Sequence, residues 1–410
     1  MNQSTKEFIS NQPFIGQLLS LIPDHIFSEA AKTTNTDEKF RKMTSKIHFI
    51  TLFYAVLTKN SSLREVCKNL ALVGQKFIKY GLAFLPCRST LSDANANRDP
   101  AYFEQIYKLT YQHYCTTLNH TQFSLPIGGQ VKASDIEVFD STTITLFKEI
   151  FKGTGKKPIN GKRKGGIKAF TKMNLAEGVP NFVCFDAACK NETSFLKTLQ
   201  LKEGAIAVFD KGFNKYQFYD KLSQELKFYV TRLKCNAKYS VVKVNKVTET
   251  HMGILKDEMI EVKYKEKGVC RTLTQRLITF QDPISSKQFE FITNIEEYKA
   301  STIALIYKNR WVIEVLFKQM KQNFELTYFL SDSPNGIKSQ IWMALILNLL
   351  FSILHRVIKQ AEDFSTMVQV VAKNLCCYMN IIKFFTQTTQ YCQDWYKEEI
   401  RKVQLELFKT

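Results

Sequence analysis

Acidic residues are scarce relative to basic ones in this chain of 410 residues. It has 38 aspartates and glutamates against 57 lysines and arginines, which gives a formal net charge of +19. The basic residues recur along most of the chain, a distribution that favours a polyanion as partner, with nucleic acid first. An anionic membrane surface is the weaker candidate, because no lysine and arginine cluster flanks a long apolar helix.

Cysteines at metal-binding spacing are also missing. The 10 cysteines are scattered, and the closest pair, Cys376 and Cys377, is adjacent and has no histidine nearby. The 6 histidines are dispersed as well, so a zinc site is not expected. This pattern predicts reduced thiols in a cytoplasmic protein.

Long apolar runs and nucleotide-binding loops are absent too. The most apolar stretch, residues 341–354, contains Asn348 and falls short of the roughly 20 residues that span a bilayer. We expect it to be a buried helix and expect no membrane partner. The first residues lack the basic start and apolar run of a signal peptide, and no GxxxxGK[ST] loop predicts NTP hydrolysis.

The first third of the chain, residues 1–130, is predicted to be mostly helical. Ser62 with Glu65 three residues later forms a capping-box pattern before an apolar repeat, and a second short helix is expected at 89–98. Two short helices in a basic region are compatible with a DNA-binding helix-turn-helix. An all-helical scaffold without base contacts fits equally well. At the other end, residues 361–410 form a predicted helical tail and a candidate dimerisation element.

Residues 131–235 change to a period typical of strands. The predicted order is β-β-β-α-β-α-β, the order of an RNase H-like nuclease core. Single strands are expected at 135–147, 205–210 and 227–234. Residues 166–188 are expected to form a hairpin of two strands that turns at Glu177 and Gly178. Helices are expected at 191–200 and 214–226. The fold class is therefore α/β with an RNase H-like mixed-sheet catalytic core.

The second half of this core is predicted to be interrupted. Residues 236–292 are rich in valine, isoleucine, threonine and aromatic residues in alternation, which indicates an inserted β subdomain. Residues 293–360 then complete the core with a helix that carries Glu314 and with the buried helix.

Two strands deliver an aspartate at their ends. Asp140 follows the apolar run IEVF, and Asp210 follows AIAVF and precedes Gly212. A rigidly held carboxylate at a strand end suits a metal ligand, although a turn or cap aspartate has the same local signature. Asp186 is a rival second acid that ranks lower, because the fold order places it on the third strand, away from the first and fourth.

A single helix over residues 306–323 is predicted to carry a polar edge. At about 100° per residue, Tyr307, Arg310, Glu314 and Lys321 fall within an arc of roughly 60°. Taken alone, Glu314 with Arg310 four residues earlier is most simply a surface ion pair. Strand one, strand four and a late helix are, however, where this fold brings three carboxylates together. Trp311 would either stack on a base or pack against the β insertion.

Three convergent carboxylates, Asp140, Asp210 and Glu314, are the ligands that Mg²⁺ or Mn²⁺ prefers. Two such ions would activate a water or a 3′-hydroxyl at a phosphodiester and stabilise the leaving oxygen. The nearby loop 151–168, with Lys162, Arg163 and Lys164, contains many basic residues and glycines and no acid. It is suited to follow a DNA backbone, or else is a solvated surface hairpin.

These motifs together resemble a known family. Tyr307, Arg310, Glu314 and Lys321 reproduce the pattern Y-x2-R-x3-E-x6-K, and Asp140 in FDSTT and Asp210 in FDKGF resemble the first two acids of the DDE transposases of insertion sequence family four. The resemblance implies that the three acids bind two catalytic metal ions, while Tyr307, Arg310 and Lys321 hold phosphates of the transposon end.

The resemblance also implies an activity and partners. Family members cut double-stranded DNA at terminal inverted repeats and join the freed 3′-OH to target DNA, acting as a pair of subunits in a synaptic complex. A location at the nucleoid in the bacterial cytoplasm is expected. Two other interpretations stay open: a structure-specific RNase H-like nuclease that hydrolyses without joining, and a catalytically inactive DNA-binding regulator.

Overall fold

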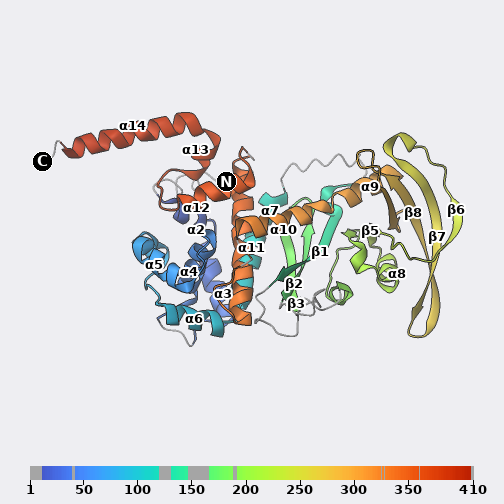
Figure 1. The fold of residues 1–410 in the computed structure, drawn as a ribbon, viewed down its shortest axis with the longest axis horizontal. Coiled ribbons are helices and arrows are strands. Elements are labelled where there is room, and N and C mark those ends of the chain that lie inside the picture. Colours follow the sequence, from blue (N-terminus) through green and yellow to red (C-terminus); the bar gives the residue numbers. More distant parts are fainter. Residues whose placement is uncertain are drawn as a thin grey trace, which may run out of the picture. The chain divides into compact units, whose positions relative to one another are not determined.

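A computed structural model describes residues 12–38, 42–119, 131–145, 166–187, 192–324, 326, 328–359 and 361–407. The chain divides into two compact units (Figure 1). Leu118–Phe317 form the first, which we call the sheet unit, and Met1–Thr117 together with Lys318–Thr410 form the second, which we call the helical unit. The predicted N-terminal domain 1–130 is thus not a unit of its own, because C-terminal helices share its core.

The sheet unit is built on the predicted RNase H-like strand order. Its first five strands lie in the order β3-β2-β1-β4-β5. Strands β1, β2 and β3 are antiparallel neighbours, whereas β1, β4 and β5 run parallel. The strands are β1 (Ile136–Thr145), β2 (Gly166–Asn174), β3 (Pro180–Ala187), β4 (Ile206–Phe209) and β5 (Phe228–Arg232). All four residues of β4 are buried, as expected for a central parallel strand.

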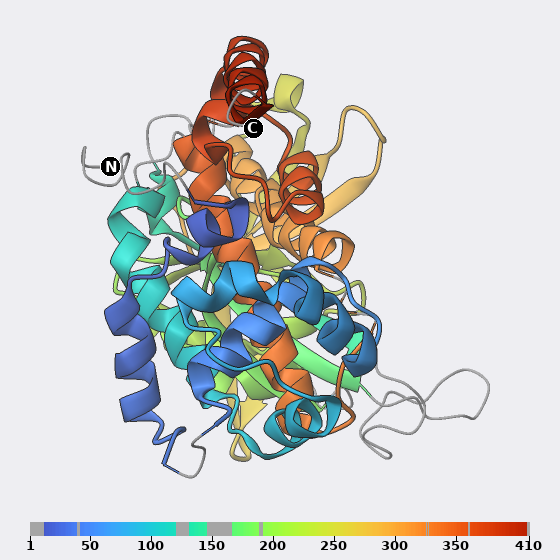
Figure 2. The ribbon, with the colours of Figure 1, turned by 90° about the vertical axis from the view of Figure 1, so that its left-hand side faces the viewer.

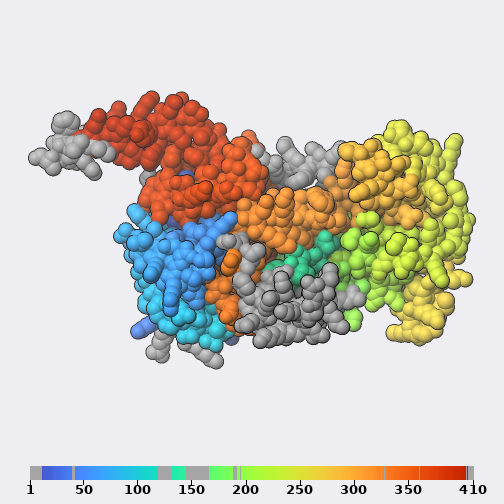
Figure 3. Space-filling model, viewed as in Figure 1, coloured from blue at the N-terminus to red at the C-terminus, as the bar shows by residue number. Residues whose placement is uncertain are grey.

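The residues of the predicted β insertion extend this same sheet. β9 pairs with β5 in antiparallel fashion, and the order continues as β9-β8-β7-β6 to give one nine-stranded mixed sheet. These strands are β6 (Ser240–Val244), β7 (Ile254–Glu266), β8 (Val269–Gln281) and β9 (Gln288–Thr293). The yellow surface of Figure 3 belongs to them. The insertion therefore does not form a sheet of its own; it lengthens the core sheet beyond β5.

An aromatic core covers one face of the central strands. Phe139 of β1 stacks on Phe209 of β4 with ring centroids 4.6 Å apart, and Phe170 of β2 stacks on Phe195 at 5.0 Å. Phe195 belongs to the 3₁₀ helix η3 (Glu192–Lys197), a tighter and shorter element than the α-helix expected at 191–200. The 3₁₀ helix η4 (Lys211–Phe213) and α8 (Tyr216–Gln224) bury Phe213 and Tyr219 in the same cluster.

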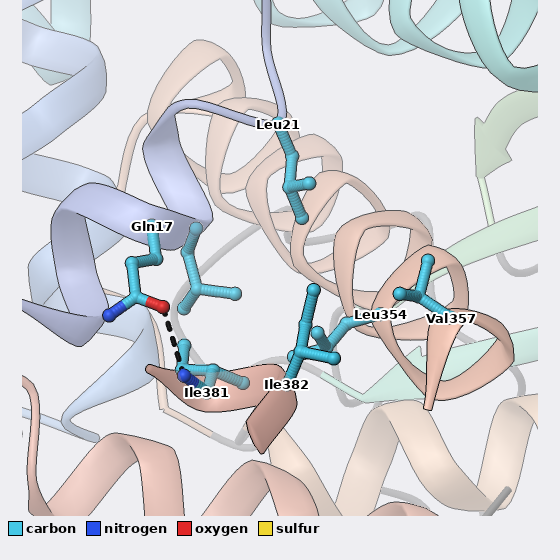
Figure 4. Close-up of a pocket in the computed structure, with 7 residues that line it drawn as sticks. Gln17, Leu21, Leu354, Val357, Ile381 and Ile382 are labelled. Atoms are coloured by element: carbon cyan, nitrogen blue, oxygen red, sulfur yellow. Dashed lines mark hydrogen bonds between the residues drawn. The ribbon is translucent and has the colours of Figure 1, made fainter. Parts of the chain in front are cut away.

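The helical unit combines both ends of the chain (Figure 2). Its elements are α2 (Phe14–Leu19), α3 (Asp24–Thr33), α4 (Ser45–Leu57), α5 (Leu63–Val73), η1 (Gly74–Tyr80), α6 (Arg88–Asn97), α7 (Ala101–Asn119), α11 (Pro334–Val357), α12 (Phe364–Lys373), α13 (Ile381–Thr386) and α14 (Thr388–Leu407). Gln17 of α2 accepts a hydrogen bond from the amide of Ile381 at 3.0 Å, beside a small apolar cavity lined by Leu21 and Leu354 (Figure 4). This contact joins N-terminal and C-terminal segments.

Of the two alternatives for α5 and α6, a helix-turn-helix or a helical scaffold, these two helices do not form the helix-turn-helix. α5 starts as the sequence indicates, with Ser62 Oγ accepting from the Glu65 amide at 3.2 Å. However, η1 and residues 81–87 separate α5 from α6, whereas a helix-turn-helix has a turn of 3–4 residues. The backbone oxygen of Asn95 in α6 accepts from Ser333 Oγ at 3.1 Å, at the start of α11. α6 is thus held in the helical scaffold.

α11 is the buried helix predicted from the apolar run 341–354, but it belongs to the helical unit and not to the catalytic core. By length and composition it could cross a membrane, yet 89% of its most apolar window is buried inside the protein. It packs against α4, α6 and α12. A helix that is apolar all round needs neighbours on every side, and the N-terminal helices supply them.

We predict that His48 makes the helical unit acid-sensitive. Its Nε2 lies 2.8 Å from Asn95 Oδ1, and burial lowers its pKa from 6.5 to about 3. Between these values the unfolded chain binds the proton and the folded chain does not, so stability falls as pH decreases from 6.5. When the pH is lowered from 7 to 5, the protonation preference of His48 should reduce the free energy of unfolding by about 2 kcal/mol, as measured by chemical denaturation.

The matched variants for this prediction are His48→Gln and His251→Gln, since His251 is exposed. His48→Gln should remove that part of the pH dependence, whereas His251→Gln should keep it. An unchanged pH slope in His48→Gln would contradict the assignment.

Candidate active site

Adjacent parallel strands bring two of the predicted acids together. The pairing of β1 with β4 ends at Phe139 opposite Phe209. Asp140 follows within β1, which continues to Thr145, and Asp210 follows directly after the end of β4. The Asp140 side chain accepts a hydrogen bond from the amide of Ser141 at 2.7 Å. The rival acid Asp186 lies on β3, which is separated from β1 by β2, so the sheet keeps it apart from this pair.

The helix that was predicted to be continuous over 306–323 is interrupted. α9 (Ala300–Lys308) ends before Asn309, and α10 (Trp311–Asn323) begins after Arg310. At the break the Arg310 amide donates to the Tyr307 oxygen at 3.0 Å, a bond to the third preceding residue. Such a 3₁₀ step aligns residues three apart more closely than an α-helix does. The Arg310 guanidinium accordingly lies over the Tyr307 ring, 5.6 Å from its centroid.

Side chains from this junction contact all three acids. Arg310 Nη1 donates to Asp140 Oδ2 at 3.0 Å, and Arg310 Nη2 donates to Glu314 Oε1 at 2.5 Å. The Tyr307 hydroxyl donates to Asp210 Oδ1 at 3.3 Å. The structure therefore brings together Asp140, Asp210, Glu314, Tyr307 and Arg310, which come from positions up to 174 residues apart in sequence (140 to 314).

The remaining predicted site residues are placed differently. Trp311 is 62% exposed, so it is not a packing residue against the β insertion. Lys321 lies on α10 seven residues after Glu314, in the part of that helix that belongs to the helical unit. Lys162, Arg163 and Lys164 lie outside the described residues.

Burial and mutual charge set the electrostatics of the site. Burial raises the pKa of Asp140 to about 6, with a further increase from the charges of Asp210 and Glu314, while the Ser141 amide and Arg310 oppose this increase. Burial also raises the pKa of the Tyr307 hydroxyl to about 12, so it remains a hydrogen-bond donor at neutral pH. The site thus concentrates negative charge in a poorly solvated place, where a cation is strongly favoured.

The donor set suits a hard divalent ion, since carboxylate oxygens are the ligands of Mg²⁺ and Mn²⁺. Within the described residues, however, no group of three or more His, Cys, Asp or Glu side chains is spaced to hold a metal ion. In this structure the guanidinium of Arg310 bridges Asp140 and Glu314 and supplies their counter-charge. The residues fit a metal chemically, provided that Arg310 releases these carboxylates.

The support of α9 depends on a buried ion pair. Arg276 of β8 binds Asp257 of β7 through two hydrogen bonds of 2.9 and 2.7 Å, and both side chains are less than 10% exposed, at 7% and 8%. Arg276 Nη1 also donates to backbone oxygens of the segment that leads into α9, namely those of Ile295, Glu296 and Tyr298. The extended sheet thereby anchors the helix that carries Tyr307.

We predict that Arg276→Met destabilises the protein by about 3–5 kcal/mol, because it leaves the Asp257 carboxylate buried without a partner. Arg271→Met is the matched control: Arg271 is 49% exposed and pairs with Asp220 and Glu266, so its loss should cost about 1 kcal/mol or less. Denaturant unfolding curves compare the two. Equal effects would mean that the buried pair does not anchor α9.

One side chain near the site was not predicted. Glu192, at the start of η3, accepts a hydrogen bond from Ser141 Oγ at 3.2 Å, directly beside Asp140. The signal available in the sequence was indirect: Gly212 follows Asp210 closely, and a glycine there permits a close approach by another group.

Comparisons with known proteins bear on the family of this chain. Residues 133–350 match the family described as Transposase DDE domain, and residues 10–83 match a domain of unknown function. A Sinorhizobium fredii protein that carries the name transposase is 25% identical over 66% of this chain and 72% of its own length. A Synechocystis protein named as a transposase of insertion sequence element IS4SA is 25% identical over 65% of this chain and 71% of its own.

A Geobacillus stearothermophilus protein, also named as an insertion sequence transposase, is 24% identical over 56% of this chain and 59% of its own length. Among solved structures, a piggyBac transposase in a synaptic complex with hairpin DNA aligns with a TM-score of 0.43 and 12% identity, over 96% of this chain and 86% of that one. That score is too low to establish a shared fold. The family match, by contrast, covers more than half of the chain, and this protein therefore belongs to the Transposase DDE domain family, as a DNA transposase that cleaves DNA and transfers strands.

Proposed function

We propose that the chain performs cut-and-paste transposition: it cleaves DNA at the terminal inverted repeats of an insertion sequence and joins the freed 3′-OH ends to target DNA. The observation that carries this proposal is the convergence of Asp140, Asp210 and Glu314 around Arg310. β1, the residue after β4 and the first turn of α10 hold these acids in a partly buried, negatively charged site, which is the environment that metal-assisted phosphoryl transfer needs.

Membership of the family implies dependence on a divalent metal ion. We propose Mg²⁺ or Mn²⁺, two ions per active site, held by Asp140, Asp210 and Glu314. When bound, such ions make a water or hydroxyl a better nucleophile and stabilise the leaving oxygen. Asp140 presents its carboxylate from the middle of β1, Asp210 from the residue after β4, and Glu314 from the first turn of α10.

The same edge is proposed to bind the DNA strand. Arg310 is suited to exchange its carboxylate partners for a phosphate, because a guanidinium binds both in a bidentate manner. The Arg310 guanidinium packs on the face of the Tyr307 ring, which helps to hold it in place. The exposed Trp311 is available to stack on a base. Lys162, Arg163 and Lys164 would follow the DNA backbone.

Further parts of the proposal concern recognition and assembly. We propose that helices within residues 1–130 bind the transposon ends, that residues 361–410 contribute to a homodimer in the synaptic complex, and that the protein acts at the nucleoid. The basic charge of the chain supports these roles. A footprint of the protein that showed no preference for the ends of its element would remove the first of them.

The experiment that tests the proposed function uses labelled linear DNA carrying the sequences that flank the gene of this protein. Purified protein with Mg²⁺ should nick at the termini and then give joined products, whereas EDTA should abolish both. Cleavage without joining would indicate a structure-specific nuclease. Binding without cleavage in Mg²⁺ and in Mn²⁺ would contradict the proposal.

A salt titration tests the role of Lys321. If Lys321 binds a phosphate, Lys321→Ala should weaken binding to the transposon end and reduce the slope of log K against log salt by about one. Lys221→Ala is the control, because this α8 lysine is 64% exposed and pairs with Glu225. A slope equal to that of the wild type would show that Lys321 does not contact phosphate.

A further inference from the structure

The hydrogen-bonded pairing of β1 with β4 ends one residue before Asp140 and Asp210, so it does not itself hold these two aspartates at a fixed separation. Its last pair is Phe139 with Phe209, and Asp140 and Asp210 both follow it. Beyond this pair the two chains diverge: β1 continues alongside β2, whereas the other chain turns into η4. The distance between the two aspartates must therefore be held by something other than this ladder.

Glu192 lies where such a link is needed. Its Oε1 accepts from Ser141 Oγ at 3.2 Å, which ties it to the residue after Asp140. Its Oε2 lies over Gly212, so close that a Cβ at position 212 would come within 2.0 Å of it. One carboxylate thus contacts the residue that follows the first acid and covers the glycine two residues after the second.

The position of Glu192 is fixed by its surroundings. Phe195, one helical turn later, is 3% exposed and packs on Phe139 and Phe213 with ring centroids 6.1 and 6.4 Å apart. These two rings precede Asp140 and follow Gly212. In addition, the buried Lys168 of β2 places its ammonium 3.6 Å from Glu192 Oε1, which offsets the cost of holding the carboxylate in place.

Glu192 acts from the opposite face of the sheet to the reacting groups. Successive side chains of a strand point to opposite faces. Phe139 and Ser141 face η3, so Asp140 between them faces Arg310 and α10. Glu192 therefore does not reach the reacting atoms, and its influence on them passes through Ser141 and Gly212.

We propose that Glu192 is a positioning residue, which links Ser141 in β1 to Gly212 after β4 and sets the separation of Asp140 and Asp210 for metal binding. The proposal rests on the proposed function of these two acids as metal ligands. It also assigns a reason to Gly212: any larger residue would displace the Glu192 carboxylate.

The test compares Glu192→Ala, Gly212→Ala and the double variant with wild type, using Mn²⁺ as the probe ion. Each single variant should weaken Mn²⁺ binding, followed by electron paramagnetic resonance of the free ion, and slow DNA cleavage by about 10- to 100-fold. The Kd for DNA should stay within about twofold, since neither residue lies on the edge proposed to bind DNA. The double variant should be no worse than the singles, because both substitutions break the same link.

Two further variants separate positioning from general stability. Glu192→Gln keeps an oxygen that accepts from Ser141 and should retain most of the Mn²⁺ affinity. Glu203→Ala, at an exposed position before β4, should behave as wild type. If Glu192→Ala does not fold, Gly212→Ala still tests the proposal. Its new methyl group displaces only the flexible Glu192 side chain, so this variant is expected to fold.

The outcomes distinguish this inference from the function on which it rests. Wild-type Mn²⁺ affinity and cleavage in Glu192→Ala, or losses that multiply in the double variant, would overturn the positioning role. A wild-type protein that binds Mn²⁺ but never cleaves would instead count against the proposed function and leave the Mn²⁺ affinities of the variants to decide the role of Glu192.

Discussion

Glu314→Gln is expected to abolish DNA cleavage and joining, by about a thousandfold or more, while DNA binding is retained. The amide has nearly the same shape as the carboxylate but lacks the charge that would hold a divalent ion, and removal of a metal ligand removes the activated nucleophile with it. Cleavage assays with Mg²⁺ and with Mn²⁺, beside gel-shift measurements of binding, would check both parts.

The matched control for this variant is Glu225→Gln. Glu225 lies at the end of α8, is 39% exposed and pairs with Lys221 and Lys227, so it tests the loss of a helix carboxylate away from the site. It should cleave as the wild type does. Cleavage by Glu314→Gln at the wild-type rate would remove Glu314 from the metal site.

Arg310→Ala is expected to have two opposite effects. In the absence of DNA, Mn²⁺ should bind more tightly, because the guanidinium no longer competes for Asp140 and Glu314. Cleavage should nevertheless slow by about a hundredfold, since the proposed phosphate contact is lost. Calorimetric titration with Mn²⁺ and single-turnover cleavage measure the two effects separately.

The stability of Arg310→Ala gives a third measurement. The Arg310 and Asp140 side chains are only 13% and 16% exposed, so the variant should lose about 2–4 kcal/mol of stability without metal. Added Mn²⁺ should restore it by binding the freed carboxylates. A variant that loses stability but binds Mn²⁺ more weakly would show that Arg310 supports the metal site and does not compete with the ion.

Local pattern was enough to predict much of the site. Asp140 and Asp210 each end a short apolar run. The run before Asp210 marks the end of β4, whereas β1 continues past Asp140 to Thr145, so the prediction of a strand end was wrong for Asp140. Tyr307, Arg310 and Glu314 are spaced so that they share one helix edge, and the 3₁₀ step at Asn309 and Arg310 preserves that edge even though it divides the helix. No glycine or proline stands at this break, so the sequence offered little to predict it.

Long-range packing could not be predicted in the same way. The apolar pattern of α11 shows that it is buried, but not that its neighbours are α4 and α6 of the helical unit. The alternating pattern of β6–β9 predicts strands, but not that β9 would pair with β5 and extend the core sheet. Glu192 reaches Ser141 across 51 positions in sequence, and no local period reports such a contact.

Asp140, Asp210 and Glu314 are proposed to form one metal site once Arg310 has left the carboxylates of Asp140 and Glu314. The most direct measurement is the anomalous scattering of Mn²⁺ in crystals of the protein bound to DNA of its transposon end. We predict Mn²⁺ within about 2.0–2.3 Å of oxygens of the three carboxylates, with Arg310 bound to a phosphate. Mn²⁺ bound elsewhere, or Arg310 still bridging Asp140 and Glu314 beside a bound ion, would contradict the account.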